Sequence, residues 1–128
     1  MENVSPLELA RIAAVAADEK KATDIVLLDL GGLSDVCDYF LICTAANARM
    51  LSSVVDEVEE KVKKNTGLGP LSHEGRAGAS WVLLDYGSVV MHVFLEETRD
   101  YYRLERLWGD APHVDLGLGE PVEERQEG

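Results

Sequence analysis

Basic side chains are scarce in this sequence. It has 12 Lys and Arg residues against 24 Asp and Glu residues, which gives a formal net charge of −12. Proteins that bind a nucleic-acid backbone or an anionic membrane surface need clustered Lys and Arg. The charge balance therefore argues against direct binding to either kind of surface.

Long apolar runs are missing as well. No segment approaches the ~20 consecutive apolar residues of a membrane-spanning helix. The opening sequence, MENVSP, lacks both the basic patch and the unbroken apolar stretch of a signal peptide. We therefore expect a cytoplasmic protein, in bacteria or in the equivalent compartment of an organelle, without a membrane anchor.

Cysteine occurs only at positions 37 and 43. An extended chain between these positions spans roughly 20 Å, which is too far for a disulfide. Because no CxxC pair is present and the three His are scattered, a metal or redox site is the weaker alternative. We predict that Cys37 and Cys43 are reduced, lie on the same face of a strand and pack in the core.

The sequence, with 128 residues, is long enough for one domain, and its predicted elements indicate an α/β fold. Helices are indicated by the start signals at Ser5-Pro6 and Asn47 and by apolar residues at helical spacing, and strands by short apolar runs between turn residues. The expected elements are a helix from 5 to about 20, strands over 24–30 and 39–44, a helix over 47–66, strands over 71–73, 81–85 and 89–95, and a helix over 96–108. Tyr101, Leu104 and Trp108 should form one stripe of this last helix. This order, α-β-β-α-β-β-β-α, predicts a mixed five-stranded sheet flanked by helices.

The helix over 47–66 carries alternating charges on its polar side. Glu precedes Lys by four residues three times, a spacing that places each pair on one helical face. The pairs are Glu57–Lys61, Glu59–Lys63 and Glu60–Lys64. We expect a solvated face, with a partner-binding surface as the alternative.

The end of the chain is acidic and contains helix-breaking residues. Gly109 and Pro112 interrupt the last helix, and the residues beyond 114 include five acids, one Arg and no aromatic side chain. Such a segment buries too little apolar surface to offset the entropy of ordering. We predict a folded domain over 1–111 and a disordered acidic tail over 112–128.

The hairpin over 81–95 contains the candidate contact residues. Strand alternation places Trp81, Leu83 and Asp85 on one face and Tyr86 on the other, while His92 lies inside the second strand. Trp81 follows a glycine-containing loop, where a side chain can stay partly exposed, and Trp is enriched in binding hot spots. We predict these five residues as a partner-binding set, with Trp81 first. The alternatives are that Trp81 is a core residue and that His92 is a half-buried, hydrogen-bonded imidazole.

The order of residues in the C-terminal half resembles the ribosomal silencing factors, or Iojap-like proteins. The matching C-terminal residues are Glu74, Gly75, Trp81, Asp85, Gly87, His92, Arg99, Tyr102, Leu104, Glu105, Leu107 and Trp108. In the first half they are Asp24, Ile25, Leu28, Asp29, Ser34, Asp38, Tyr39, Phe40, Ile42, Cys43 and Arg49. Ser80 departs from the pattern, because the family usually has an acid before the Trp.

The resemblance implies a translation regulator that is not an enzyme. Members of that family bind the large ribosomal subunit through its fourteenth protein, on the face that meets the small subunit. They block subunit joining, slow translation when nutrients are short, and are described as homodimers. A net charge of −12 fits a basic ribosomal protein better than bare RNA. A large-subunit assembly factor that uses the same site is the alternative within this class.

The resemblance also implies a topology shared with nucleotidyltransferases, so we considered a Mg²⁺-dependent transferase as the alternative of another class. Such enzymes hold the metal with carboxylates on one strand face. Here Asp35 and Asp38 are three apart and Asp24 and Asp29 are five apart, odd separations that point to opposite faces of a strand. Neither a G-x-S-x-G elbow nor a P-loop is present. We therefore expect no catalytic residue, metal or cofactor.

Overall fold

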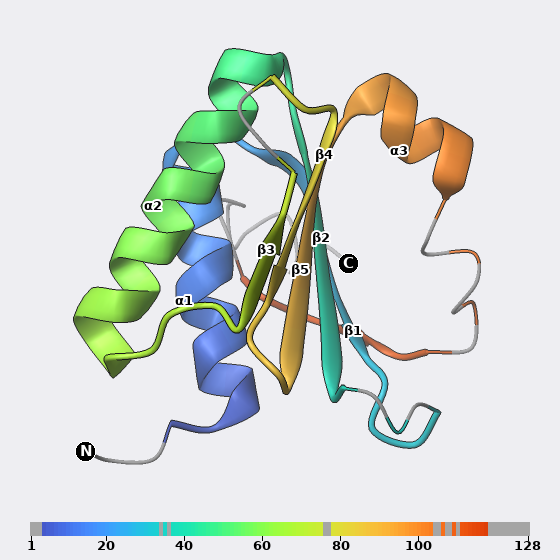
Figure 1. The fold of residues 1–128 in the computed structure, drawn as a ribbon. Helices are drawn as coiled ribbons and strands as arrows, with labels where there is room; N and C mark the ends of the chain where they lie inside the picture. Colours follow the sequence, from blue (N-terminus) through green and yellow to red (C-terminus); the bar gives the residue numbers. More distant parts are fainter. Residues whose placement is uncertain are drawn as a thin grey trace.

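The computed structural model describes residues 4–33, 35, 37–75, 78–103, 106, 109 and 111–117. A single sheet separates two groups of helices (Figure 1). Helices α1 (Pro6–Glu19) and α2 (Ala48–Thr66) cover one face, and the short helix α3 (Glu96–Tyr102) lies on the other side. The expected α/β architecture, a mixed sheet flanked by helices, is confirmed.

The sheet has six strands, in the order β3-β4-β5-β2-β1-β6. The bounds are β1 Thr23–Asp29, β2 Tyr39–Ala45, β3 Ser72–Glu74, β4 Trp81–Asp85, β5 Val89–Leu95 and β6 His113–Val114. β2 and β5 pair in parallel and all other neighbours pair antiparallel. The hairpin strands β4 and β5 have the bounds that the sequence predicts.

The expected number of five strands is wrong because of β6. His113 and Val114 pair with Leu28 and Leu27 of β1, and the Pro112 carbonyl accepts a hydrogen bond from the Asp29 amide at 2.9 Å. Two residues are too few to show strand periodicity, but they satisfy backbone groups on an otherwise open strand edge. The ordered chain therefore runs into the segment assigned to the tail, and residues 118–128 of that tail lie outside the described residues.

The two long helices begin where their capping residues predict. The Ser5 hydroxyl accepts from the Glu8 amide at 3.1 Å, and the Asn47 side chain accepts from the Met50 amide at 2.9 Å. Each bond satisfies one of the amide groups that a helix start leaves unpaired. α2 ends at Gly67, whose φ of 82° is the left-handed conformation that glycine adopts without strain.

The core under the helices depends on small residues in α1. Ala10, Ala14 and Ala17 are fully buried, and they let the helix approach both the sheet and α2 closely. From α2, Leu51, Val54, Val58 and Val62 fill the same cluster. The face that carries α3 has a smaller core with Leu28, Ile42, Val90 and Phe94 at its centre.

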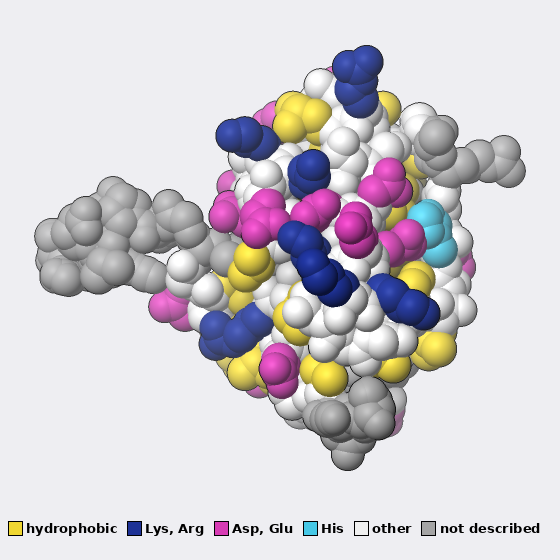
Figure 2. Space-filling view, turned by 90° about the vertical axis from the view of Figure 1, so that its left-hand side faces the viewer, with side chains coloured by type: hydrophobic (Ala, Val, Ile, Leu, Met, Phe, Trp, Pro, Cys, Tyr) yellow, Lys and Arg dark blue, Asp and Glu magenta, His cyan; other side chains and the backbone are white. Residues whose placement is uncertain are grey.

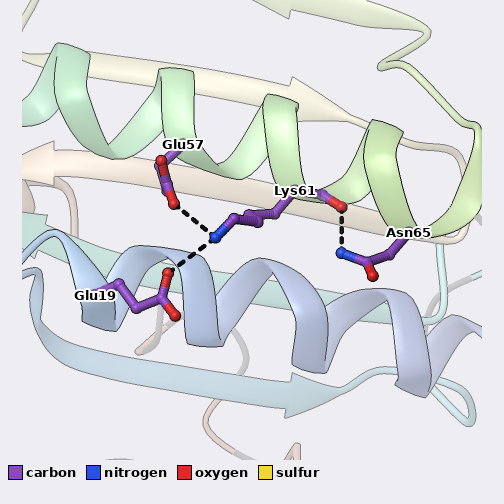
Figure 3. Close-up of polar contacts among 4 residues, drawn as sticks. All are labelled: Glu19, Glu57, Lys61 and Asn65. Atoms are coloured by element: carbon purple, nitrogen blue, oxygen red, sulfur yellow. Dashed lines mark hydrogen bonds and ion pairs between the residues drawn. The ribbon is translucent and has the colours of Figure 1, made fainter.

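Lys61 links the two helices on their outer side. Its ammonium group lies 3.0 Å from Glu57 of α2 and 3.3 Å from Glu19 of α1 (Figure 3). Of the three predicted Glu–Lys pairs, only Glu57–Lys61 is formed in the described part of the chain; Glu59 instead contacts His73 Nδ1 at 2.8 Å. The charged face thus connects α2 to α1 and to β3, because neighbouring elements offer partners within reach. Figure 2, which views this side, shows the acidic side chains gathered in a band with Lys and Arg around it.

Both cysteines are free and buried, as predicted. Their placement on one face is wrong, because Cys43 packs in the core beneath α1 and α2, whereas Cys37 packs in the core on the opposite face. β2 begins only at Tyr39, so strand alternation does not extend back to Cys37. Complete burial raises the pKa of Cys43 to about 12, which keeps it a protonated thiol.

The last helix is shorter than expected. α3 ends at Tyr102, and Arg103 follows in a left-handed conformation with a φ of 46°. Tyr101 was expected on the apolar stripe of this helix but is 80% exposed. The predicted stripe members Leu104 and Trp108 lie outside the described residues.

Candidate partner-binding surface

Successive side chains of β4 point to opposite faces of the sheet. Val82 and Leu84 point into the core beneath α1 and α2, and Trp81 and Leu83 pack against the smaller core on the opposite face. Burial alternates in step, since Val82 and Leu84 are buried while Trp81, Leu83 and Asp85 are partly exposed. The predicted division of the strand is confirmed, and it leaves three of the five predicted contact residues accessible on one face.

Trp81 is held in a group of aromatic rings. It is stacked on Phe94 of β5, with ring centroids 4.9 Å apart and an interplanar angle of 30°. Tyr102 of α3 lies 4.8 Å from it at an angle of 46°, and is itself 48% exposed. Trp81 is therefore neither a free surface residue nor a core residue: it is supported by rings and retains an accessible part.

His92 lies beneath Trp81. Its Nδ1 accepts a hydrogen bond from the indole Nε1 at 3.1 Å, and the Phe40 ring meets it edge-on with centroids 4.7 Å apart. The side chain is buried, and Nε2 has no hydrogen-bond partner among the described residues. The expected half-burial is therefore wrong, whereas the expected hydrogen bonding is present at Nδ1 and absent at Nε2. Burial lowers the pKa of His92 to about 4, so the ring is neutral near pH 7.

Tyr86 and Asp85 contribute to the turn of the hairpin. Asp85 Oδ1 accepts from the Gly87 amide at 2.8 Å, and Gly87 has a φ of 92°. Tyr86 is buried against the core beneath α1 and α2, and its hydroxyl has no partner in the described part of the chain. Burial, and to a smaller degree the charge of Glu59, raises the pKa of Tyr86. His92 thus lies below the surface that Trp81, Leu83 and Asp85 present, whereas Tyr86 lies on the opposite face of the sheet.

Three rings around Trp81 and His92 were missed at the level of sequence. The hairpin register could have identified Phe94, because a tight turn at 86–88 places Trp81 opposite Phe94. Phe40 reaches the cluster only through the parallel pairing of β2 with β5, which joins segments that are distant in sequence. Tyr102 depends on how α3 folds back over the sheet, for which no local signal exists.

Arg99 fixes α3 to the sheet. It is buried, and its guanidinium donates to the Asp24 carbonyl at 2.7 Å and to the Thr44 hydroxyl at 2.8 Å. Asp24 has a φ of 47° beside an irregularity in the β1–β2 pairing. The bond from Arg99 thus stabilises an unusual backbone conformation and positions the helix that carries Tyr102.

Gly75 allows the loop before β4 to lie against Trp81. Its φ is 105°, and an added Cβ would lie 2.8 Å from the Trp81 carbonyl oxygen. We predict that Gly75→Ala lowers the free energy of unfolding by about 1–3 kcal/mol, because it combines backbone strain with a clash against main-chain atoms. Urea unfolding measures the change.

Gly78→Ala is the matched control, because Gly78 also has a positive φ, 89°, but no atom lies within 4 Å of the added Cβ. It should lose less stability than Gly75→Ala. Equal losses would show that strain alone, and not contact with Trp81, makes glycine necessary at position 75.

Within the described ranges, no group of three or more His, Cys, Asp or Glu side chains is arranged to hold a metal ion. No helix in the same ranges is long and apolar enough to cross a membrane.

Asp29 accepts a hydrogen bond from the Gly31 amide at 2.9 Å and so shapes the turn after β1. Ser34, one of the residues shared with the resembled family, lies outside the described residues.

Comparison with known proteins supports the sequence resemblance. The family model described as "Ribosomal silencing factor during starvation" matches residues 3–128. The chain belongs to this family. A ribosomal silencing factor from Bacillus subtilis is 45% identical over 111 residues, which cover 87% of this chain and 93% of that protein.

One solved structure and one further relative are informative about fold and function. A crystal structure of a protein from Chromobacterium violaceum superposes on this silencing-factor chain with a TM-score of 0.78 at 33% identity, covering 83% of this chain and 88% of the other. A mouse protein named "Mitochondrial assembly of ribosomal large subunit protein 1" is 32% identical over 92 residues, 70% of this chain and 40% of its own length.

Proposed function

We propose that this chain binds the large ribosomal subunit at its fourteenth ribosomal protein, on the face that meets the small subunit. Its presence there blocks subunit joining and so represses translation in starved cells. A folded domain of this length is roughly 25–30 Å across, wide enough to obstruct contacts between two surfaces that must touch. The mechanism is steric and requires no catalysis, cofactor or membrane.

The observation that carries this proposal is the supported, partly exposed indole of Trp81. Phe94 and Tyr102 hold it on the sheet face opposite α1 and α2. A large side chain that is already fixed loses little entropy on binding, and such residues dominate the energetics of interfaces. Leu83 and Asp85 extend the proposed surface along β4, and Tyr102 extends it toward α3. Of the two buried members of the predicted set, His92 supports this surface from below, whereas Tyr86 packs in the core on the opposite face of the sheet.

The charge of the chain supports a basic protein as the partner. A net charge of −12 repels exposed RNA and attracts the basic side chains by which ribosomal proteins hold RNA. Long-range attraction of this kind raises the association rate and makes it sensitive to salt. The close contact around Trp81 then limits dissociation.

Sedimentation of ribosomal subunits tests the proposal. Purified large and small subunits are mixed with and without the protein and separated on sucrose gradients, with nucleotide consumption measured in parallel. We expect the protein to travel with the large subunit, fewer joined ribosomes, and no nucleotide turnover. Failure to co-sediment with any ribosomal particle, or nucleotide turnover by the protein, would overturn the proposal.

The name of the mouse relative favours a role in large-subunit assembly as the second candidate. Both roles involve binding to the large subunit, so the experiment that distinguishes them analyses ribosomal subunits in cells that lack the protein. Silencing predicts normal subunits that join too readily during starvation. Assembly predicts precursors of the large subunit that accumulate during growth.

We also propose that the chain forms a homodimer, an expectation that rests on the family resemblance. Light scattering over a range of concentrations tests it. A strict monomer at every concentration would contradict the expectation without affecting the proposed binding to the subunit.

Ser80 offers a charge test of the proposed surface, because it is exposed and precedes Trp81. We predict that Ser80→Asp strengthens binding to the large subunit by roughly two- to fivefold, the range of an exposed ion pair. The gain should shrink in high salt. Ser80→Asn is the matched control of similar shape, and an equal gain in both variants would rule out a charge effect.

A further inference from the structure

The side chains of Trp81 and His92 are joined by a hydrogen bond whose direction is defined. The indole nitrogen has only a proton to donate, so His92 Nδ1 must be the acceptor of the 3.1 Å contact. The neutral imidazole then carries its own proton on Nε2. That second nitrogen is buried and has no partner.

This arrangement is costly for a residue that serves packing alone. A buried donor without an acceptor keeps the desolvation penalty and gains no compensating bond. Phe40 and Phe94 lie beside His92, with ring centroids 4.7 Å and 6.1 Å away, so a phenyl ring at position 92 would suit these neighbours without an orphan nitrogen. Among the described residues, the single hydrogen bond of the His92 side chain is the one to Trp81.

The other contacts of Trp81 do not fix its orientation. Phe94 stacks on the indole at 4.9 Å and Tyr102 approaches it at a tilt at 4.8 Å, and neither contact has the directionality of a hydrogen bond. Such contacts tolerate sliding and turning of one ring over the other. Only the bond from Nε1 to His92 defines which edge of the indole points into the protein and which edge stays accessible.

We infer that His92 is a positioning residue that locks the Trp81 indole in its binding orientation. The inference rests on the proposed function, in which Trp81 is the anchor of the contact with the large subunit. His92 touches no partner itself; it acts by reducing the freedom that Trp81 would otherwise lose on binding. Fixing one side chain in this way changes affinity by up to about tenfold.

The test compares four variants for affinity to purified large subunits and for melting temperature. His92→Phe removes both nitrogens and keeps a ring, His92→Gln restores an acceptor, and Trp81→Phe keeps an aromatic ring without the N–H group. The fourth combines Trp81→Phe with His92→Phe. Two-dimensional ¹H–¹⁵N spectra follow the indole N–H of Trp81, which is assigned by its loss in Trp81→Phe.

We expect His92→Phe to keep or raise the melting temperature and yet to weaken binding by about five- to tenfold. His92→Gln should recover part of the affinity. In the Trp81→Phe background, His92→Phe should have no further effect, because the bond is already absent. The indole proton of the native protein should exchange slowly with water, and faster in His92→Phe.

Three results would overturn the inference. They are unchanged affinity in His92→Phe, an equal loss of affinity in the Trp81→Phe background, and rapid exchange of the indole proton in the native protein. The exchange measurement on the native protein needs no variant of His92, only Trp81→Phe for the assignment, so it tests the inference even if His92→Phe does not fold. If Trp81→Ala itself leaves affinity unchanged, the proposed anchor fails; if it abolishes binding while His92→Phe does not alter it, only the positioning role fails.

Discussion

Replacing Trp81 by alanine is expected to weaken binding to the large ribosomal subunit by about 2 kcal/mol or more, which corresponds to a loss of roughly thirtyfold or more in affinity. The indole is partly accessible on the proposed surface and is already held by Phe94 and Tyr102. The same substitution removes the ring contacts with Phe94, Tyr102 and His92 and is expected to lower the free energy of unfolding by about 1–3 kcal/mol. Titration of labelled protein against large subunits measures the first effect, and urea unfolding measures the second.

Val82→Ala is the matched control for this experiment. Val82 is the next residue of β4 but points into the core beneath α1 and α2. Its truncation should cost a comparable amount of stability, about 1–3 kcal/mol, and leave affinity unchanged. The anchor role of Trp81 is excluded if both variants lose affinity equally, or if Trp81→Ala stays folded and binds as tightly as the native chain.

The protein is expected to lose stability steeply in mild acid because of His92. Burial lowers the pKa of this imidazole from 6.5 to about 4, whereas the unfolded chain binds the proton near pH 6.5. The unfolded state therefore holds more protons between these two values, and folding stability falls as the pH falls through that window. The stabilisation is fully present above pH 6.5; its loss should be of the order of 1 kcal/mol at pH 5.5 and about 3 kcal/mol at pH 4.

Chemical unfolding of the native chain and of His92→Phe at several pH values isolates this effect. Carboxylates titrate in both proteins, so only the difference between them reports His92. The two curves should run parallel above pH 7 and move apart toward pH 4, because the native protein weakens relative to His92→Phe. A constant difference between pH 7 and pH 4 would contradict the assigned proton balance.

The sequence predicts those parts of the fold that are fixed by neighbouring residues. Ser5 and Asn47 cap their helices as expected because each bonds an amide three residues ahead. The hairpin has the predicted bounds because the turn at 86–88 and the strand alternation are local signals. The same alternation correctly separated Trp81 from Tyr86.

The errors arise where distant segments meet. β6 pairs with β1 across a separation of more than 80 residues, and its two residues give no periodic pattern. His92 was expected to be half-buried from its place inside a hairpin strand. It is buried because Phe40, on a parallel strand that is distant in sequence, and Trp81 both pack against it. The charges of α2 were expected to pair along the helix. Glu57 and Lys61 do so, but Lys61 also pairs with Glu19, and Glu59 pairs with His73 of β3.

The two outermost strands of the sheet are also the shortest, with three residues in β3 and two in β6. A sheet grows by adding strands to a long row of free N–H and C=O groups, the route to fibres and to permanent strand exchange. In the described part of the chain, the edge strands β3 and β6 are themselves too short to offer such a row. Association with another molecule is therefore directed to side chains on a face, where contact can form and be released without unfolding either partner.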